Sequence, residues 1–328
     1  MRHRGELCGG LPGLTLPLPL PPIVDLQLTH DALLSSTLNH GLKVMGDRWT
    51  AAVLLGAFTG VKRFEDWQVQ LTIPRSTLTD RLGKLVKLGL LRQRPYQERP
   101  RRQAYHLTQA GLKLYDQVLM IWMWERRWGQ RARSLPGYLR HKSCGHPFLP
   151  VLACTACSEK TGMNDLTFSL QPVPELLLAE NLSRNARVTS ASTQSMGQGL
   201  RVDRWSLLIV TAVVLGCHYF DELGRVLGIV SSVLARRLSG MVETGLLLAQ
   251  PDVADARRML YRLTPASRDL FGYLVCFSTW ASRDYLQQPS AIRPVHKACG
   301  HRFVPKVLCS ACRAPVLPWE VSFSDKPD

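Results

Sequence analysis

The sequence lacks the features that mark membrane proteins and the commonest enzymes. It contains no uninterrupted apolar run near the ~18 residues that a membrane-spanning helix requires, so we expect no membrane partner. It also lacks the Walker A, GxGxxG, HExxH and GxSxG motifs, and no paired acid and base stands out. We therefore expect the protein not to be an enzyme.

Acidic residues are scarce relative to basic ones. The 328 residues include 25 Asp and Glu against 41 Lys and Arg, which gives a formal net charge of +16. Such a surplus favours a polyanionic partner, either nucleic acid or an anionic membrane surface. The basic and apolar start resembles an export signal only superficially, because prolines interrupt it between Pro12 and Pro22. We expect residues 1–23 to form a disordered tail.

The chain is an internal duplication. The letters DRW at 47–49 recur at 203–205, and the same offset of 156 residues still holds between Trp124 and Trp280. After one deletion the offset becomes 155, and HKSCGH at 141–146 then aligns with HKACGH at 296–301. Each unit therefore contains a first part and a cysteine-rich second part.

The first part of each unit has the pattern of three short helices, a hairpin and a closing helix. In the first unit, Leu78, Leu82 and Leu85 share one face of the third helix, and Pro74 fits its first turn. An arginine-rich hairpin follows from residue 90 to residue 107. Thr108 then caps a long helix that we expect to run to about Trp128.

This order of elements predicts an α+β fold with two winged helix-turn-helix domains, each followed by a small zinc-ribbon-like β module. The third helix of such a domain lies in the major groove of double-stranded DNA, and the wing reaches the phosphates or the minor groove. The expected boundaries are 24–135 and 198–290 for the winged helices, 136–172 and 291–328 for the ribbons, and 173–197 for the linker.

The first unit resembles the HxlR-type winged-helix regulators. The resemblance rests on the GDRW opening, the RF corner at 63–64, the LTDRLGKL recognition helix and the YHLTQAG exit, and it is weaker in the second unit. It implies a cytoplasmic, nucleoid-associated transcriptional regulator that forms dimers through its terminal helices. Here the pair can be a homodimer or an intrachain pseudo-dimer of the two units. Several members sense oxidants through a cysteine before the opening motif, where this chain has Ser36.

The DNA-contacting residues expected from this fold fall into three groups. The first group faces base edges, the second holds phosphates, and the third belongs to the divergent second unit, whose wing also contains Asp252 and Asp255. Because these carboxylates repel phosphate, we expect the second unit to assist binding, or to dimerise, more than to read bases. The residues are Arg75, Ser76, Thr77, Thr79 and Asp80; Lys84, Arg99, Arg101 and Arg102; and Ser232, Arg236, Arg257 and Arg258.

The cysteine-rich parts have the spacing of zinc ribbons. An H-x-x-C knuckle and a C-x-x-C knuckle supply four tetrahedral ligands and leave no open position, which indicates structural zinc, with two ions per chain. We expect one set in each unit, with His146 and His301 as rival nitrogen ligands. The two sets are His141, Cys144, Cys154 and Cys157, and His296, Cys299, Cys309 and Cys312.

The leading hypothesis is therefore a sequence-specific DNA-binding transcriptional regulator, most simply a repressor. The alternative is a protein-interaction scaffold, in which the second winged helix and the ribbons recruit partners. Neutralising the wing arginines would weaken binding to all DNA sequences alike under the first hypothesis and leave function intact under the second.

Overall fold

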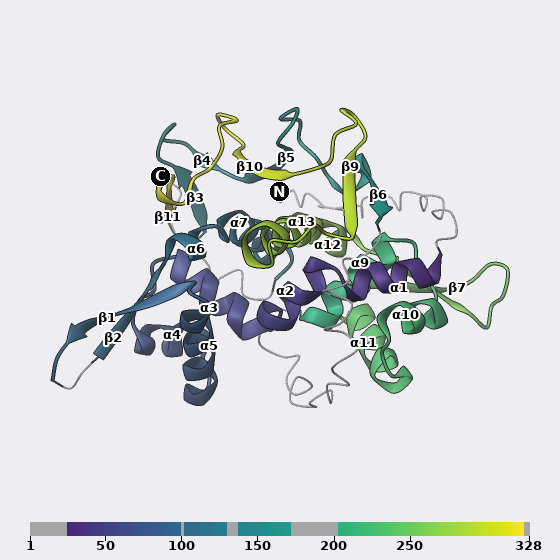
Figure 1. The fold of residues 1–328 in the computed structure, drawn as a ribbon, viewed down its shortest axis with the longest axis horizontal. Helices are drawn as coiled ribbons and strands as arrows, with labels where there is room; N and C mark the ends of the chain where they lie inside the picture. Colours follow the sequence, from purple (N-terminus) through teal and green to yellow (C-terminus); the bar gives the residue numbers. More distant parts are fainter. Residues whose placement is uncertain (1–24, 100–101, 130–136, 172–202, 325–328) are drawn as a thin grey trace, which may run out of the picture.

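The computed structural model describes residues 25–99, 102–129, 137–171 and 203–324. Two winged-helix units lie side by side, with helices packed between them, and the cysteine-bearing strands lie along the opposite side from the third helix of each unit (Figure 1). The predicted tail, the whole of the predicted linker and Arg101 lie outside the described residues.

The first winged helix has the predicted order of elements. Asp47 caps α3, where its carboxylate accepts a hydrogen bond from Thr50 N at 3.0 Å, and Gly60 follows the helix with φ +96°. The third helix begins one residue later than predicted, because Pro74 is its N-cap rather than its first helical residue. The elements are α3 (Arg48–Phe58), α4 (Phe64–Leu71), α5 (Arg75–Lys87), β1 (Leu91–Gln97) and β2 (Arg102–Leu107).

The predicted closing helix is wrong in one respect, because it consists of two helices. Thr108 caps only α6 (Gln109–Leu112), and α7 (Tyr115–Trp128) follows. Leu114 N donates to Gly111 O at 3.1 Å, three residues back, which tightens the turn and buries the Leu114 side chain completely. The break is invisible in the sequence because no proline marks it.

The second winged helix repeats this arrangement. Thr264 caps its closing segment and Pro265 occupies the first helical turn, as predicted. A π-helical turn, Ala281–Tyr285, continues α13. The elements are α9 (Arg204–Val214), α10 (Phe220–Leu227), α11 (Ser231–Glu243), β7 (Leu247–Pro251), β8 (Met259–Leu263), α12 (Pro265–Asp269) and α13 (Phe271–Trp280).

The two units form an intrachain pair through their closing helices. Helix α7 packs against α13, and Trp124 Nε1 donates to Ala266 O of the other unit at 2.7 Å. Asp269 accepts from Trp128 Nε1 at 2.7 Å and pairs with Arg127 at 3.0 Å. The pair of units on one chain therefore has the helix-to-helix contact that the resemblance implies for dimers.

Two N-terminal helices join the first unit to the second. Helix α1 (Leu26–Leu34) packs on α10, where His30 Nδ1 lies 2.9 Å from Arg225 O, and α2 (Thr37–Met45) packs on α13. Ser36 is fully buried and caps α2 through Asn39 N at 3.0 Å. Ser36, the position that the family resemblance compares with a sensor cysteine, is thus a helix cap here.

The cysteine-rich segments do not form one ribbon per unit. Strand β5 (Pro150–Cys154) pairs with β10 (Pro305–Cys309) of the other unit, β3 (Tyr138–His141) with β11 (Val321–Ser324), and β6 (Leu166–Leu170) with β9 (Ile292–His296). Only the short β4 (Pro147–Phe148) pairs with a strand of its own unit, β3. Short 3-10 turns at Met163–Asp165 and Pro318–Glu320 complete this interleaved region.

Candidate nucleic-acid interface and metal centres

Helix α5 presents a polar face away from the core. Leu78, Leu82 and Leu85 are fully buried and fix the rotation of the helix, as the spacing predicts. The opposite face brings together most of the residues expected at base edges: Arg75, Ser76, Thr79 and Asp80 are exposed, and Thr77 is half-buried. Asp80 has no ion pair with any residue that the structure describes. The face is therefore open to a ligand in solution.

An ion pair that the sequence did not reveal anchors α5 to α3. Arg81 Nε lies 2.8 Å from Asp47 Oδ1, the same carboxylate that caps α3, and the second unit repeats the pair between Arg237 and Asp203 at 2.6 Å. The signal in the sequence was that both partners recur at the offset of 156 residues, Asp47 as Asp203 and Arg81 as Arg237. Lys84, expected on phosphates, is half-buried beside this pair, and burial lowers the pKa of its ammonium group.

The first wing carries unpaired positive charge. Arg92, Arg94, Arg99 and Arg102 are all exposed on or beside β1 and β2. None of the four has an ion pair with a residue in the described ranges. The hairpin extends away from the body of the molecule (Figure 1). Its guanidinium groups can therefore reach a surface that lies beyond the domain.

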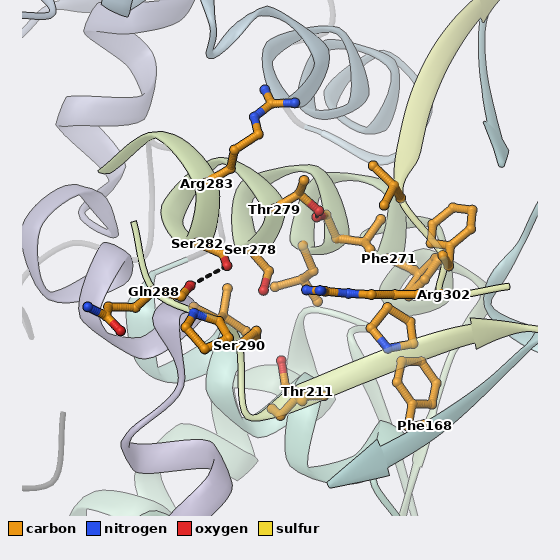
Figure 2. A pocket seen from close by; sticks show the side chains of 18 of the residues that line it. Phe168, Thr211, Phe271, Ser278, Thr279, Ser282, Arg283, Gln288, Ser290 and Arg302 are labelled. Carbon is orange, nitrogen blue, oxygen red and sulfur yellow. Dashed lines mark hydrogen bonds between the residues drawn. The ribbon is translucent and has the colours of Figure 1, made fainter. Parts of the chain in front are cut away.

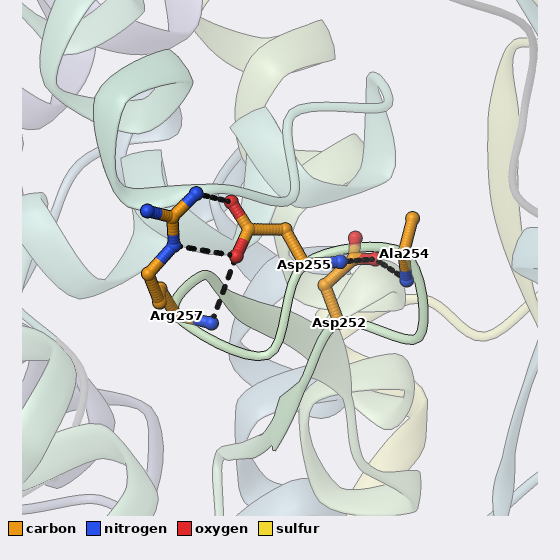
Figure 3. Close-up of polar contacts among 4 residues, drawn as sticks. All are labelled: Asp252, Ala254, Asp255 and Arg257. Carbon is orange, nitrogen blue, oxygen red and sulfur yellow. Dashed lines mark hydrogen bonds and ion pairs between the residues drawn. The ribbon is translucent and has the colours of Figure 1, made fainter.

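The arginines of the second wing are paired within their own unit, and Figure 3 shows the pair between Arg257 and Asp255. Arg257 forms two contacts with Asp255, at 3.0 and 3.2 Å, and this hydrogen bonding lowers the pKa of the Asp255 carboxyl. Arg258 pairs with Asp221 at 2.9 Å and stacks 3.9 Å from the centre of the Tyr219 ring. Both cations therefore have partners within their own unit.

The same hairpin is held by a further carboxylate. Asp252 accepts hydrogen bonds from the Tyr219 hydroxyl and, at 2.6 Å, from Ala254 N. On α11, Ser232 and Arg236 are exposed as expected, whereas Arg237 is committed to its pair with Asp203. The second unit thus offers less free positive charge than the first.

The eight expected metal ligands do come together, but in exchanged sets. One cluster contains His141 and Cys144 of the first unit with Cys309 and Cys312 of the second; the other contains Cys154 and Cys157 with His296 and Cys299. The prediction of one set per unit is therefore wrong. The five-residue strand β5 is extended over about 16 Å, and it carries the second knuckle away from the first and toward the other unit.

The distances within each cluster match a tetrahedral ion. Zn–S bonds of ~2.3 Å and Zn–N bonds of ~2.05 Å at tetrahedral angles place two sulfurs about 3.8 Å apart and a sulfur and a nitrogen about 3.6 Å apart. Cys144 Sγ lies 4.0 Å from Cys309 Sγ, and Cys154 Sγ lies 3.9 Å from Cys299 Sγ. The Nδ1 atom of each histidine lies 3.3 Å from a sulfur, Cys312 for His141 and Cys299 for His296. Each cluster therefore fits one metal ion of its own.

Neighbouring groups prepare the ligands. The backbone N–H of Ala314 lowers the pKa of the Cys312 thiol to about 7, which favours the thiolate that binds metal. The outer nitrogens of the histidines face oxygens of neighbouring side chains: His296 Nε2 lies 3.4 Å from Thr161 Oγ1, and His141 Nε2 lies 3.7 Å from Glu320 Oε2, beyond hydrogen-bond distance. The Nδ1 atoms therefore face the sulfurs in both clusters.

The rival histidines do not take part. His146 and His301 are exposed and lie outside both clusters, and their carbonyl oxygens accept the backbone N–H of His141 and His296 at 3.0 Å. Two further cysteines, Cys217 and Cys276, are buried outside the clusters. Burial raises the pKa of the Cys217 thiol to about 12.

No helix in the described ranges is both long enough and apolar enough to cross a bilayer.

Comparison with known proteins finds the HxlR-like helix-turn-helix family over residues 44–133 and again over 201–289. An uncharacterized HTH-type transcriptional regulator of Mycobacterium tuberculosis (strain CDC 1551 / Oshkosh) is 38% identical over 131 residues, which are 40% of this chain and 83% of that protein. A second uncharacterized HTH-type transcriptional regulator, from Mycobacterium bovis, is 37% identical over 131 residues, which again are 40% of this chain and 83% of that protein.

The family matches more than half of the chain, in two copies that coincide with the two winged helices. The family and these relatives are transcriptional regulators rather than enzymes. The chain belongs to the HxlR-like helix-turn-helix family, as a tandem DNA-binding transcriptional regulator with two cysteine and histidine clusters that can hold metal ions.

Proposed function

We propose that the chain reads duplex DNA chiefly through its first winged helix, with α5 in the major groove and the first wing on phosphates. The observation that carries this proposal is the contrast between the wings. Exposed arginines without described ion-pair partners occupy the first, whereas Arg257 and Arg258 of the second are already paired. When an unpaired guanidinium group neutralises a DNA phosphate, counterions condensed on the DNA are released, which favours binding. A guanidinium group that already has a carboxylate partner contributes less to this release.

The roles of the individual residues follow from this placement. Arg75, Ser76, Thr77, Thr79 and Asp80 would face base edges, and Arg99 and Arg102 would hold phosphates. The phosphate contact expected of Arg101 stays a prediction from the sequence, because this residue lies outside the described residues. Lys84 would contribute less than expected, because it is half-buried beside the Arg81 and Asp47 pair. In the second unit, Ser232 and Arg236 are exposed and would make auxiliary contacts.

We also propose that both clusters hold structural zinc. Three cysteines and one histidine in each set are typical zinc ligands, and four protein ligands leave no open position for catalysis. Because each cluster draws ligands from both units, the two ions would fix the relative placement of the two winged helices. A fixed spacing of recognition helices is what a two-part DNA site requires.

Repression by occupation of a promoter remains a prediction, and transcription in vitro from a bound promoter tests it. The scaffold alternative is favoured by no particular observation among the described residues. The exposed charge of the first wing supports DNA binding instead, because a solvated guanidinium row suits a phosphate backbone.

The salt dependence of DNA binding tests the proposal. Affinity for a selected duplex should fall steeply with salt, with a slope of log K against log salt of about −0.9 for each phosphate contact. Fluorescence anisotropy between 50 and 300 mM salt measures the slope. An affinity that does not change with salt concentration would contradict the proposal that the first wing binds phosphates.

A further inference from the structure

A cavity of about 500 Å³ lies in the second unit (Figure 2). Its wall is built from α13 and the π-helical turn after it, from α9, and from the strands beside the metal clusters. Leu38 of α2 also lines it. A volume in this range suits a small organic ligand. The cavity therefore lies where both units and the metal-bearing region meet.

The duplication shows how the cavity arises. At the offset of 156 residues, Ser278 of the cavity wall aligns with Trp122, Thr211 with Leu55, and Val214 with Phe58. Trp122 is 2% exposed and Leu55 is 5% exposed, so the larger side chains are packed in the first unit. The second unit has smaller side chains at all three positions.

The lining combines an apolar surface with one free cation. Phe168, Phe271 and Phe303 contribute aromatic walls, and no Asp or Glu is among the described residues of the lining. Arg302 points into the cavity in Figure 2, and its side chain has no ion pair or hydrogen bond with the residues that the structure describes. Arg283, the other arginine of the lining, is paired with Asp284 at 2.9 Å.

A buried hydroxyl group adds a second polar position. Ser290 lines the cavity and is 6% exposed, and its Oγ has no hydrogen-bond partner within the described part of the chain. A buried hydroxyl without a partner is costly, and a ligand oxygen would satisfy it. By contrast, Ser282 Oγ already donates to Gln288 O at 2.5 Å.

We propose that this cavity binds an aromatic monocarboxylate. The ring lies against the phenylalanine walls, and the carboxylate lies on the guanidinium group of Arg302, which presents a planar fork suited to it. Control of DNA binding by this ligand rests on the proposed function of the chain. Binding of the ligand itself does not, so the two are measured separately.

Titration calorimetry on the full-length, metal-loaded protein tests the site, with 2-naphthoate as the probe and 2-naphthalenemethanol as its neutral analogue. Naphthoate is expected to bind with one site per chain, at least about tenfold more tightly than the alcohol, because the charged hydrogen bond is lost in the alcohol. Arg302→Gln should remove that difference. Ser278→Trp, which restores the side chain of the first unit, should abolish binding of both compounds.

Arg225→Gln is the matched control, because it removes an exposed arginine that does not line the cavity, and its titration should match that of the unchanged protein. Absence of naphthoate binding, equal affinity for acid and alcohol, or full binding by the Ser278→Trp protein would each overturn the proposal. Circular dichroism verifies that the variants fold. If the protein binds naphthoate but no DNA, the proposed function fails and the ligand site stands.

Discussion

Replacing Cys144 and Cys309 together by serine is expected to remove one zinc ion per chain and to leave the second in place. The two residues belong to one cluster, with their sulfurs 4.0 Å apart, although they come from different units. The remaining His141 and Cys312 cannot complete a tetrahedral set. The other cluster keeps all four ligands. Elemental analysis after dialysis against a chelator measures the zinc content.

The matched control for this experiment replaces Cys144 and Cys154, two cysteines of the same unit. In the exchanged arrangement these residues belong to different clusters, so each cluster loses one of its four ligands and both ions should become removable by the chelator. A ribbon confined to each unit would give the reverse pattern for the two double variants. One ion lost from the Cys144 and Cys154 variant, with both lost from the other, would refute the exchange.

Removal of charge from the first wing is expected to weaken DNA binding for every sequence. The double change Arg99→Ala and Arg102→Ala removes two exposed guanidinium groups that have no described ion pair. Affinity should fall by about 10- to 100-fold near 0.1 M salt, and the salt slope should become shallower by about 2. Anisotropy titrations with a selected duplex and with an unrelated duplex measure both quantities.

The corresponding double change in the second wing, Arg257→Ala and Arg258→Ala, is the control. It removes the same formal charge from a hairpin of the same kind, but from groups that are held by Asp255 and Asp221. We expect a loss of no more than about threefold, which reflects the screened change in net charge. An equal loss from the two wings would contradict the assignment of the phosphate contacts to the first unit.

The winged helices were predictable from the sequence because local rules decide them. Leucines at 78, 82 and 85 fix the buried face of α5, and the glycines after α3 and α5 adopt the positive φ that ends those helices. The break between α6 and α7 was not predictable, since it depends on how Leu114 packs into the core. The N-terminal helices α1 and α2 were not predicted either. They pack on α10 and α13 of the second unit, and such long-range contacts cannot be inferred from local sequence patterns.

The ligand types of the clusters were predictable, and their pairing was not. The spacing of the two knuckles is the same in both units, so the sequence fits either a ribbon within each unit or an exchange between them. Long-range strand pairing decides between the two, as Leu152 of β5 faces Val307 of β10. Similarly, the aspartates of the second wing suggested weaker DNA binding, but only the geometry revealed that Asp255 holds Arg257 and that Asp221 of α10 holds Arg258.

The sequence logo of duplexes selected from random DNA by the intact protein tests the central claim most directly. If the first winged helix reads the bases and the second assists, the selected sequences should specify one half-site strongly, with the adjoining half-site almost free in sequence. A palindrome with two equally specified half-sites would contradict this account, because it would require α11 to read DNA as well as α5 does.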